Sequence, residues 1–301
     1  MEAPAPGIGN WAGAPSALVT PNGVLLAYRL RAPRPRRGYE LRLASSSDGR
    51  AFRDVWTLRS DDLGTPSMER ASLVAISGGV RLYLSYVDPV DARWRIDVLE
   101  AETPEQLDLR TRRAAITAQS ASVETVKDPV VMRHHGGWLM FVSFGSRELP
   151  AVSGSSHSLH ETADALSTGQ LLSCTGLATS QDGLTWQWEG PVLIPLRRGW
   201  DGFETRISVV IPRSDGWLGL YDGIPSLADN YEERTGIATS PDLRMWTRQS
   251  TDGPAFRSPY ASGSLRYACA VQLGGEMLVY FEAARADGAH DLMVATAQVS
   301  G

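Results

Sequence analysis

Short apolar runs separated by glycine-rich turns recur along the whole chain, and helical periodicity is nearly absent. In the most frequent unit, an apolar strand leads through a turn such as Pro-Asn-Gly or Gly-Gly into a second strand dense in aromatic residues. This pattern is typical of a β-hairpin. The hairpin occurs at residues 16–30, 70–87, 128–144, 206–223 and 266–283. Regular recurrence of one unit indicates a repeat architecture.

A second repeated unit follows three of the hairpins, as LASSSDGRAFRDVW at 43–56, LATSQDGLTWQW at 177–188 and IATSPDLRMWTR at 237–248. In each copy a strand ends in Ser, an Asp caps the turn, and an aromatic residue leads into the next strand. The two units together predict four strands per repeat. Five such sheets around an axis make an all-β, five-bladed β-propeller. A two-sheet sandwich is the alternative, but it does not explain the fivefold recurrence of one hairpin.

The repeats predict a single propeller domain over residues 1–301, with blades at approximately 16–60, 69–112, 127–193, 204–250 and 265–300. Successive strands of a blade are antiparallel, so the first strands of all blades open at one mouth of the central channel. The openings are Pro15–Ser16, Glu69–Arg70, Lys127–Asp128, Glu204–Arg206 and Leu265–Tyr267. Four of the five carry charge, and long connections rise from the same face. Such a mouth is a predicted binding site.

Composition narrows the classes of function. A formal net charge of −5 argues against nucleic acid or an anionic membrane as partner, and no apolar run is long enough for a membrane helix. The first residues lack the basic and apolar regions of a secretory signal, which favours a cytoplasmic protein or a secreted one whose signal has been removed. We expect Cys174 and Cys269 to be buried free thiols rather than a disulfide. No motif predicts a metal site or a cofactor.

The chain resembles the five-bladed glycoside hydrolases, most closely family 43, the clan of arabinanases and β-xylosidases. The resemblance rests on the S-x-D-G-x-x-W turns, on Asp-Pro-Val-Val at 128–131 and on Glu-Thr-Arg at 204–206. It implies that Glu204 is the general acid and that Asp128 tunes the proton affinity of that acid. The family's general base, an Asp opening the first blade, has no counterpart, because Ser16 stands at the expected place.

A base must then come from elsewhere if a glycosidic bond is hydrolysed with inversion, since the acid and the base flank the bond about 6.5–9.5 Å apart. Glu69, which opens the second blade, is the preferred candidate, and Asp222 and Asp88 are alternatives. Each acid at the mouth also has a structural interpretation, as one half of an ion pair.

Further residues are candidates for contact with the substrate. Guanidinium groups at a mouth suit a carboxylate, a phosphate or a polyhydroxylated ligand, and tryptophans stack on sugar rings. The candidates are Arg70, Arg206, Arg266, Tyr267, Asp222, Glu282, Trp11 and Trp200. Trp11 and Trp200 precede first strands, so burial between blades is an equally reasonable role for both.

The leading hypothesis is a glycosidase-like enzyme that acts on an oligosaccharide or a small-molecule substrate. The arginines at the mouth would accommodate an anionic substrate. One alternative is a non-hydrolytic enzyme on the same scaffold, either a phosphorylase or a biosynthetic lyase or cyclase. Another is a sugar-binding propeller without catalysis, which the missing acid of the first blade favours. A shared scaffold does not settle the chemistry.

Overall fold

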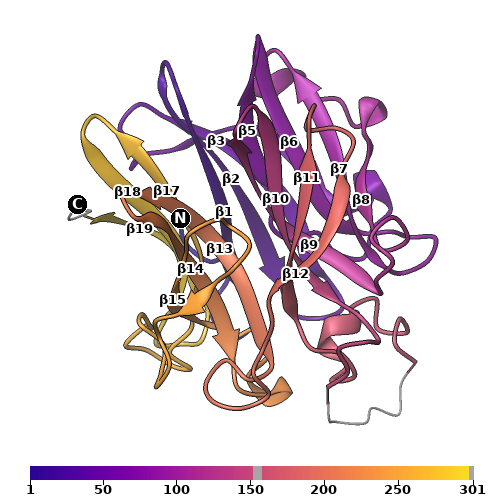
Figure 1. Ribbon diagram of the computed structural model, residues 1–301. Helices are drawn as coiled ribbons and strands as arrows, with labels where there is room; N and C mark the ends of the chain where they lie inside the picture. The colour runs from indigo at the N-terminus through magenta and orange to yellow at the C-terminus, as the bar shows by residue number, and fades with distance from the viewer. Residues whose placement is uncertain (152–157, 298–301) are drawn as a thin grey trace.

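The computed structural model describes residues 1–151 and 158–297, and in this part of the chain nearly all regular structure is β-strand (Figure 1). Three sheets have four strands each. They consist of β5 (Ser72–Ile76), β6 (Gly79–Val87), β7 (Trp94–Ala101) and β8 (Arg113–Thr117); β9 (Thr125–His134), β10 (Gly137–Gly145), β11 (Cys174–Ser180) and β12 (Gln187–Leu193); and β13 (Glu204–Arg213), β14 (Gly216–Ile224), β15 (Arg234–Ser240) and β16 (Thr247–Arg248).

A fourth sheet has seven strands in the order β17-β18-β19-β1-β2-β3-β4. Its members are β17 (Leu265–Leu273), β18 (Glu276–Ala284), β19 (His290–Ala297), β1 (Trp11–Thr20), β2 (Gly23–Ala32), β3 (Arg37–Ser46) and β4 (Arg53–Arg59). The parallel contact of Trp11 with His290 joins two antiparallel meanders, one of three strands and one of four. The short helical turns are α1 (Ser60–Leu63), η1 (Pro104–Gln106), η2 (Leu109–Thr111), η3 (Ala165–Ser167) and η4 (Leu227–Asp229).

The β-propeller prediction is confirmed. The blade count of five and the single domain stay predictions, with which the five meanders agree. Two boundaries differ from the expected ones: the first blade begins at Trp11 rather than at residue 16, and the last strand of the second, β8, lies beyond residue 112. Trp11 therefore belongs to β1 and does not precede it.

The first residues of the chain lie beside its last strand. The ammonium of Met1 donates to the Leu292 carbonyl at 2.8 Å, and the Ala3 amide donates to Asp291 Oδ1 at 2.8 Å. Figure 1 shows the N-terminus and β19 on the same side of the molecule. The segment before β1 thus covers the outer edge of β19 and closes the ring of sheets.

The repeated Ser-x-Asp turns explain why the outer hairpins recur. In the first copy the Ser46 hydroxyl accepts from the Gly49 amide at 2.9 Å, and Asp48 Oδ1 accepts from the amides of Arg50 and Ala51. The same bonds recur at Ser180 with Asp182 and at Ser240 with Asp242. A side chain that satisfies the amides of a tight turn fixes that turn locally.

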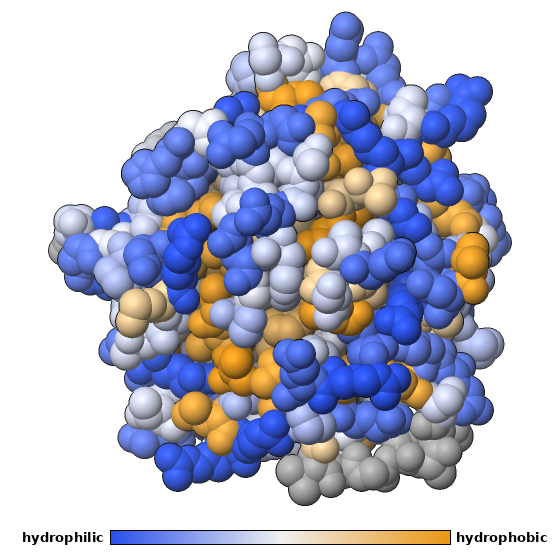
Figure 2. All heavy atoms as spheres, turned by 45° about the vertical axis from the view of Figure 1, so that its right-hand side comes forward, coloured by the Kyte–Doolittle hydropathy of each residue, from blue (hydrophilic) through white to orange (hydrophobic). Residues whose placement is uncertain are grey.

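Apolar side chains pack between neighbouring sheets, and hydrophobic surface on the face in Figure 2 is mostly confined to strips between hydrophilic residues. Cys174 and Cys269 are buried free thiols, as expected, and burial raises the pKa of the Cys174 thiol to about 12. Among the described residues, no helix has the length and apolar character that crossing a membrane requires.

Candidate functional site

Backbone pairing defines one ring of equivalent positions at the channel mouth. Each position lies opposite the end of the second strand of its own sheet, as Arg206 lies opposite Asp222 and Arg266 opposite Glu282. The ring consists of Gly13, Glu69, Lys127, Arg206 and Arg266. In β1 only a glycine fits, because a Cβ on Gly13 would lie 1.9 Å from Glu282 Oε2. The ring therefore has four charged side chains and, beside Gly13, the buried carboxylate of Glu282 from β18.

In three of the strands, β1, β9 and β17, the next position along the strand lies at a bulge. Ala14, Asp128 and Tyr267 have φ values of 53°, 55° and 54°, which L-residues rarely adopt. Ala14 and Asp128 are each followed by Pro, and the ladder changes register at both. Ala14, rather than Ser16, is thus the counterpart of Asp128 in β1. The Ser16 hydroxyl instead accepts a bond from the Leu73 amide.

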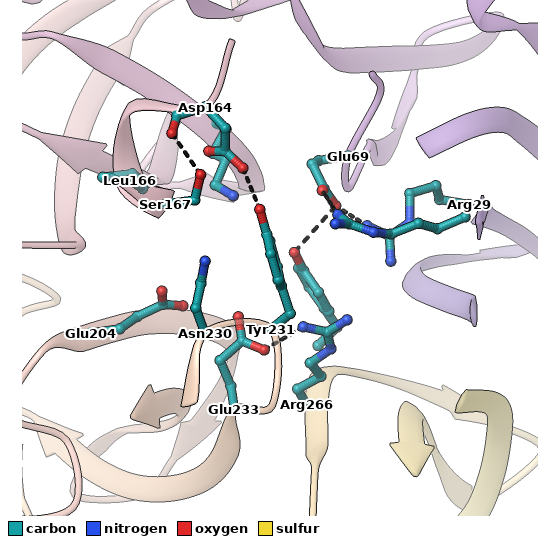
Figure 3. A pocket seen from close by; sticks show the side chains of 13 residues that line it. Arg29, Glu69, Asp164, Leu166, Ser167, Glu204, Asn230, Tyr231, Glu233 and Arg266 are labelled. Carbon is teal, nitrogen blue, oxygen red and sulfur yellow. Dashed lines mark hydrogen bonds and ion pairs between the residues drawn. The ribbon is translucent and has the colours of Figure 1, made fainter. Parts of the chain in front are cut away.

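A small cavity, here named the inner cavity, lies at the mouth (Figure 3). Its lining is Arg29, Arg31, Glu69, Lys127, Asp164, Leu166, Ser167, Glu204, Asn230, Tyr231, Glu233, Arg266 and Tyr267. Its volume is about 10 Å³, which is room for about one water molecule. The lining carries four cations and four carboxylates, so the site is strongly polar and close to neutral. A sugar ring enters only if part of the lining moves.

Glu204, at the start of β13, is buried and lines this cavity with a carboxyl group that lacks a full set of partners. Its Oε1 lies 3.1 Å from the Arg206 guanidinium without hydrogen-bond geometry. Burial raises the pKa of Glu204 to about 7; Arg206 opposes the shift, and the charges of Glu233 and Asp128 add to it. A carboxyl group with this pKa is partly protonated at neutral pH, as a general acid requires.

Glu233 lies at the end of the connection before β15 and lines the same cavity. Burial alone would raise the pKa of this carboxyl, but Arg266 and Arg206 outweigh burial and lower it to about 2. Arg266 forms an ion pair with Glu233 Oε2, and Arg206 Nη1 lies 3.4 Å from Oε1. One cavity thus holds two carboxyl groups whose pKa values are driven apart, a pattern that marks acid and base assignments in enzymes.

Glu69, the expected base, also lines the inner cavity, but it is fully engaged. Arg29 forms an ion pair with its Oε2, and Arg31 Nη1 lies 3.1 Å from its Oε1. The Tyr267 hydroxyl donates to Glu69 Oε2 and to Asp128 Oδ2, each at 3.4 Å. Both carboxylate oxygens of Glu69 are thus held by guanidinium groups.

Arginines hold the carboxylates behind the cavity. Arg206 reaches Asp222 Oδ2 at 3.0 Å and Asp128 Oδ2 at 3.5 Å, and its guanidinium lies 3.8 Å from the centre of the Tyr267 ring. Arg266 reaches Glu282 Oε1 at 2.6 Å. Burial of each arginine would lower its pKa, but the surrounding anions raise the pKa of both well above the ordinary value. These arginines are permanent cations.

The remaining candidates lie away from the inner cavity. Asp222 and Glu282 are fully buried and contact arginines rather than the cavity. Arg70 lies deeper in the channel and donates to the carbonyls of Ser208 at 2.7 Å and Ala268 at 3.3 Å, so it ties three sheets together. Trp200 is not at the mouth: its indole donates to the Ser250 carbonyl, and its ring packs on Tyr221. Trp200 is half-buried and packs against its own sheet rather than at the mouth.

Trp11 lies at the edge of the mouth, buried beneath other groups. Its ring stacks on His290 with a centroid distance of 4.8 Å, and the guanidiniums of Arg31 and Arg266 lie 4.6 and 4.5 Å from its centre. His290 bridges Glu282 and Glu232. Trp11 serves as a platform, but the groups stacked on it are side chains of the protein.

Tyr231 closes the cavity. It lies in the connection between β14 and β15 with φ of 72°, and its hydroxyl donates to Asp164 Oδ2 at 2.8 Å. Figure 3 shows its ring crossing the centre of the view between Asp164 and Glu233. Asp164 is itself buried in the long connection between β10 and β11. Burial would raise the pKa of Asp164, but Lys127 and Arg37 outweigh it and lower this pKa to about 2.

Several lining residues were not identified from sequence. Glu233, Asp164 and Tyr231 belong to connections without a repeat pattern. Lys127 belongs to the predicted ring, because it precedes Asp128 at the opening of the third blade. Its place at the mouth could therefore be predicted from sequence. Within the described ranges no group of His, Cys, Asp and Glu side chains is arranged to hold a metal ion.

No family model and no curated protein matches the sequence, but solved structures do match the fold. A structure titled "Glycoside hydrolase" covers 100% of this chain and 93% of its own, with a TM-score of 0.69 and 15% identity. The chain shares the glycoside hydrolase propeller fold. A family 43 β-xylosidase/α-arabinofuranosidase from a compost microbial metagenome, solved with xylotriose, covers 98% and 93%, with a TM-score of 0.65 and 14% identity.

A third match is a β-1,2-mannobiose phosphorylase from Listeria innocua, solved with β-1,2-mannobiose. It covers 96% of this chain and 89% of its own, with a TM-score of 0.63 and 16% identity. Hydrolases and a phosphorylase therefore share this architecture, and the fold alone does not decide the chemistry of this chain.

Proposed function

We propose that this protein cleaves a glycosidic bond in the inner cavity, with Glu204 as the general acid. The observation that carries the proposal is the pair of unlike carboxyl groups: the pKa of Glu204 is raised to about 7, while that of Glu233 is lowered to about 2. Glu204 protonates the leaving oxygen as the bond between that oxygen and the anomeric carbon breaks. The ionised Glu233 stabilises the positive charge that develops on the sugar.

Asp128 contributes indirectly. Its carboxylate lies beside Arg206, and its charge adds to the rise in the pKa of Glu204. This arrangement supports the tuning role that the resemblance implies for Asp128. In β1, where the same resemblance implies a base, Ala14 offers only a methyl group.

The nucleophile decides between two reactions. Hydrolysis needs a carboxylate that removes a proton from water, and Glu69 is the candidate chosen from sequence. Both Glu69 and Glu233 are paired with two guanidiniums, so neither carboxylate can contact an attacking water molecule unless an arginine moves away. An inorganic phosphate anion needs no such base, because it is already ionised.

Phosphorolysis is therefore the second candidate. A phosphate oxygen would attack the anomeric carbon, the glycosidic bond would break, and the leaving oxygen would take the proton of Glu204. The products are a sugar 1-phosphate and an alcohol. The four cations of the cavity lining, and a phosphorylase among the structures with the same fold, favour this reaction.

The experiment is a product assay with a panel of glycosides, with and without phosphate. Free sugar in both conditions indicates hydrolysis, and sugar 1-phosphate that forms only with phosphate indicates phosphorolysis. Glu204→Gln should lower kcat for alkyl glycosides about 10²–10⁴-fold and leave binding intact. Glu40→Gln, a buried glutamate paired with Arg42 outside the mouth, is the matched control and should stay active.

Two results would contradict the proposal. Full activity of Glu204→Gln would reject the role of this residue. Saturable binding of an oligosaccharide by the natural protein, with no product in either condition, would support a binding propeller without catalysis.

A further inference from the structure

A second hollow, here named the outer cleft, lies directly beside the inner cavity. Its lining is Ile8, Gly9, Trp11, Arg31, Pro33, Asn230, Tyr231, Glu232, Ala261, Ser262, Ala286, Asp287 and Gly288. Its volume is about 490 Å³, within the range of small-molecule sites. Arg31, Asn230 and Tyr231 line both hollows. The two spaces are therefore neighbours with a common wall.

The outer cleft differs in chemistry from the inner cavity. Its charged side chains are already paired within the protein: Arg31 with Glu69, Glu232 with His290, and Asp287 with Arg285. Most of the rest of its lining is small or apolar, and Ile8 is 76% exposed. An exposed isoleucine at the rim offers apolar area, whose burial contributes about 25 cal/mol per Å².

The common wall has one fixed side and one movable side. The Arg31 guanidinium lies between two rings, 4.6 Å from the centre of Trp11 and 4.3 Å from that of Tyr231. Trp11 is buried and fixed by its stack on His290. Tyr231 is partly exposed in a connecting loop, and its hydroxyl makes one hydrogen bond, to Asp164. Rotation of Tyr231 would join the two hollows.

We propose that the outer cleft binds the leaving group of the substrate and that this group is apolar, an aryl or alkyl aglycone rather than a second sugar. The inference rests on the proposed function, since the scissile bond would cross the wall at Tyr231. A second sugar would bring hydroxyl groups to a surface whose charged groups are already paired, and unmatched hydroxyls are costly to desolvate. A planar or alkyl group needs no such partners.

The test compares two glycosides of the best sugar found in the product assay, one with a methyl and one with a 4-nitrophenyl leaving group. Ile8→Asp and Ala286→Asp should raise KM for the 4-nitrophenyl glycoside about tenfold and leave the methyl glycoside unchanged. Val90→Asp is the matched control, because Val90 is also apolar and 91% exposed but lies outside both hollows. Equal KM values in all variants and the natural protein, for both substrates, would overturn the inference.

A direct binding measurement separates this inference from the proposed function. Free 4-nitrophenol, titrated by tryptophan fluorescence, should bind the natural protein and the Val90→Asp variant alike, and Ile8→Asp about tenfold more weakly. That result with no turnover of any glycoside would reject the proposed reaction and keep an apolar site. Unchanged binding in Ile8→Asp would reject the apolar site, whatever the enzyme activity.

Discussion

The strands that line the channel have two unlike halves. At the mouth, β13 begins with Glu204, Thr205 and Arg206, all buried and polar; further along, Val209 and Ile211 pack with Ala268 of β17. The same change occurs in β9, where Lys127 and Asp128 precede a run of valines. In β1, β9 and β17 a bulge separates the halves, and in β13 the register shifts between Ile207 and Val209. The apolar half is specified by hydrophobic pattern, and the mouth half by pairing of charges.

The largest expected effect concerns catalysis at the mouth. Glu204→Gln removes the proton donor, so kcat for an alkyl glycoside should fall about 10²–10⁴-fold. Ile211→Val, in the apolar half of the same strand, should leave kcat unchanged. Steady-state kinetics measures both variants, and equal losses in the two would mean that the halves do not differ in function.

Stability should show the next largest contrast. Arg206→Met leaves buried carboxylates, among them Asp222 and Glu233, without their shared cation, which should cost about 3–5 kcal/mol of unfolding free energy. The adjacent Ile207→Val should cost about 0.5–1.5 kcal/mol. Chemical denaturation of both variants gives the comparison. Similar losses at the two positions would show that charge pairing does not specify the mouth.

A pH-dependent gain in stability should accompany the loss of activity in Glu204→Gln. The pKa of Glu204 is about 7 in the folded protein against an ordinary value of 4.5, so between these pH values the folded state keeps a proton that the unfolded chain releases. Stability of the natural protein therefore falls as pH rises through this window. Glutamine does not titrate, so the variant should gain up to about 3 kcal/mol relative to the natural protein by pH 8. For Ile211→Val, the difference in unfolding free energy from the natural protein should be the same at pH 4.5 and pH 8.

The smallest effect concerns the closure of the mouth. Tyr231→Phe removes the hydroxyl that donates to Asp164 and keeps the ring on Arg31, so it should cost about 1 kcal/mol or less. Because the wall is then held less firmly, association of a ligand with the inner cavity should become faster. Stopped-flow binding measures the rate. Slower association than in the natural protein would contradict the role of Tyr231 as the movable side.

Sequence predicted the parts of this molecule that depend on local pattern. The hairpins, the Ser-x-Asp turns and the ring that includes Lys127 and Arg266 follow from alternation, turn chemistry and strand direction. The partners of each charge did not follow. Glu233 and Asp164 reach the cavity from connections without a repeat, and their positions depend on arginines distant in sequence. No local pattern encodes such contacts. The start of the first blade at Trp11, rather than at residue 16, was also not predicted. The bulge at Ala14 interrupts the alternation of apolar and polar residues in this strand.

The pairing of the first residues with β19 has a consequence for folding order. Among the described strands every other pair joins neighbours along the chain, whereas the contact of Trp11 with His290 joins the first of these strands to the last. Local hairpins form quickly, and distant pairings carry a larger loop-closure cost. On a ribosome the segment before β1 would therefore wait until β19 has been made. We expect the ring of sheets to close in a late, separate kinetic step of folding, in which the edge of β19 pairs last.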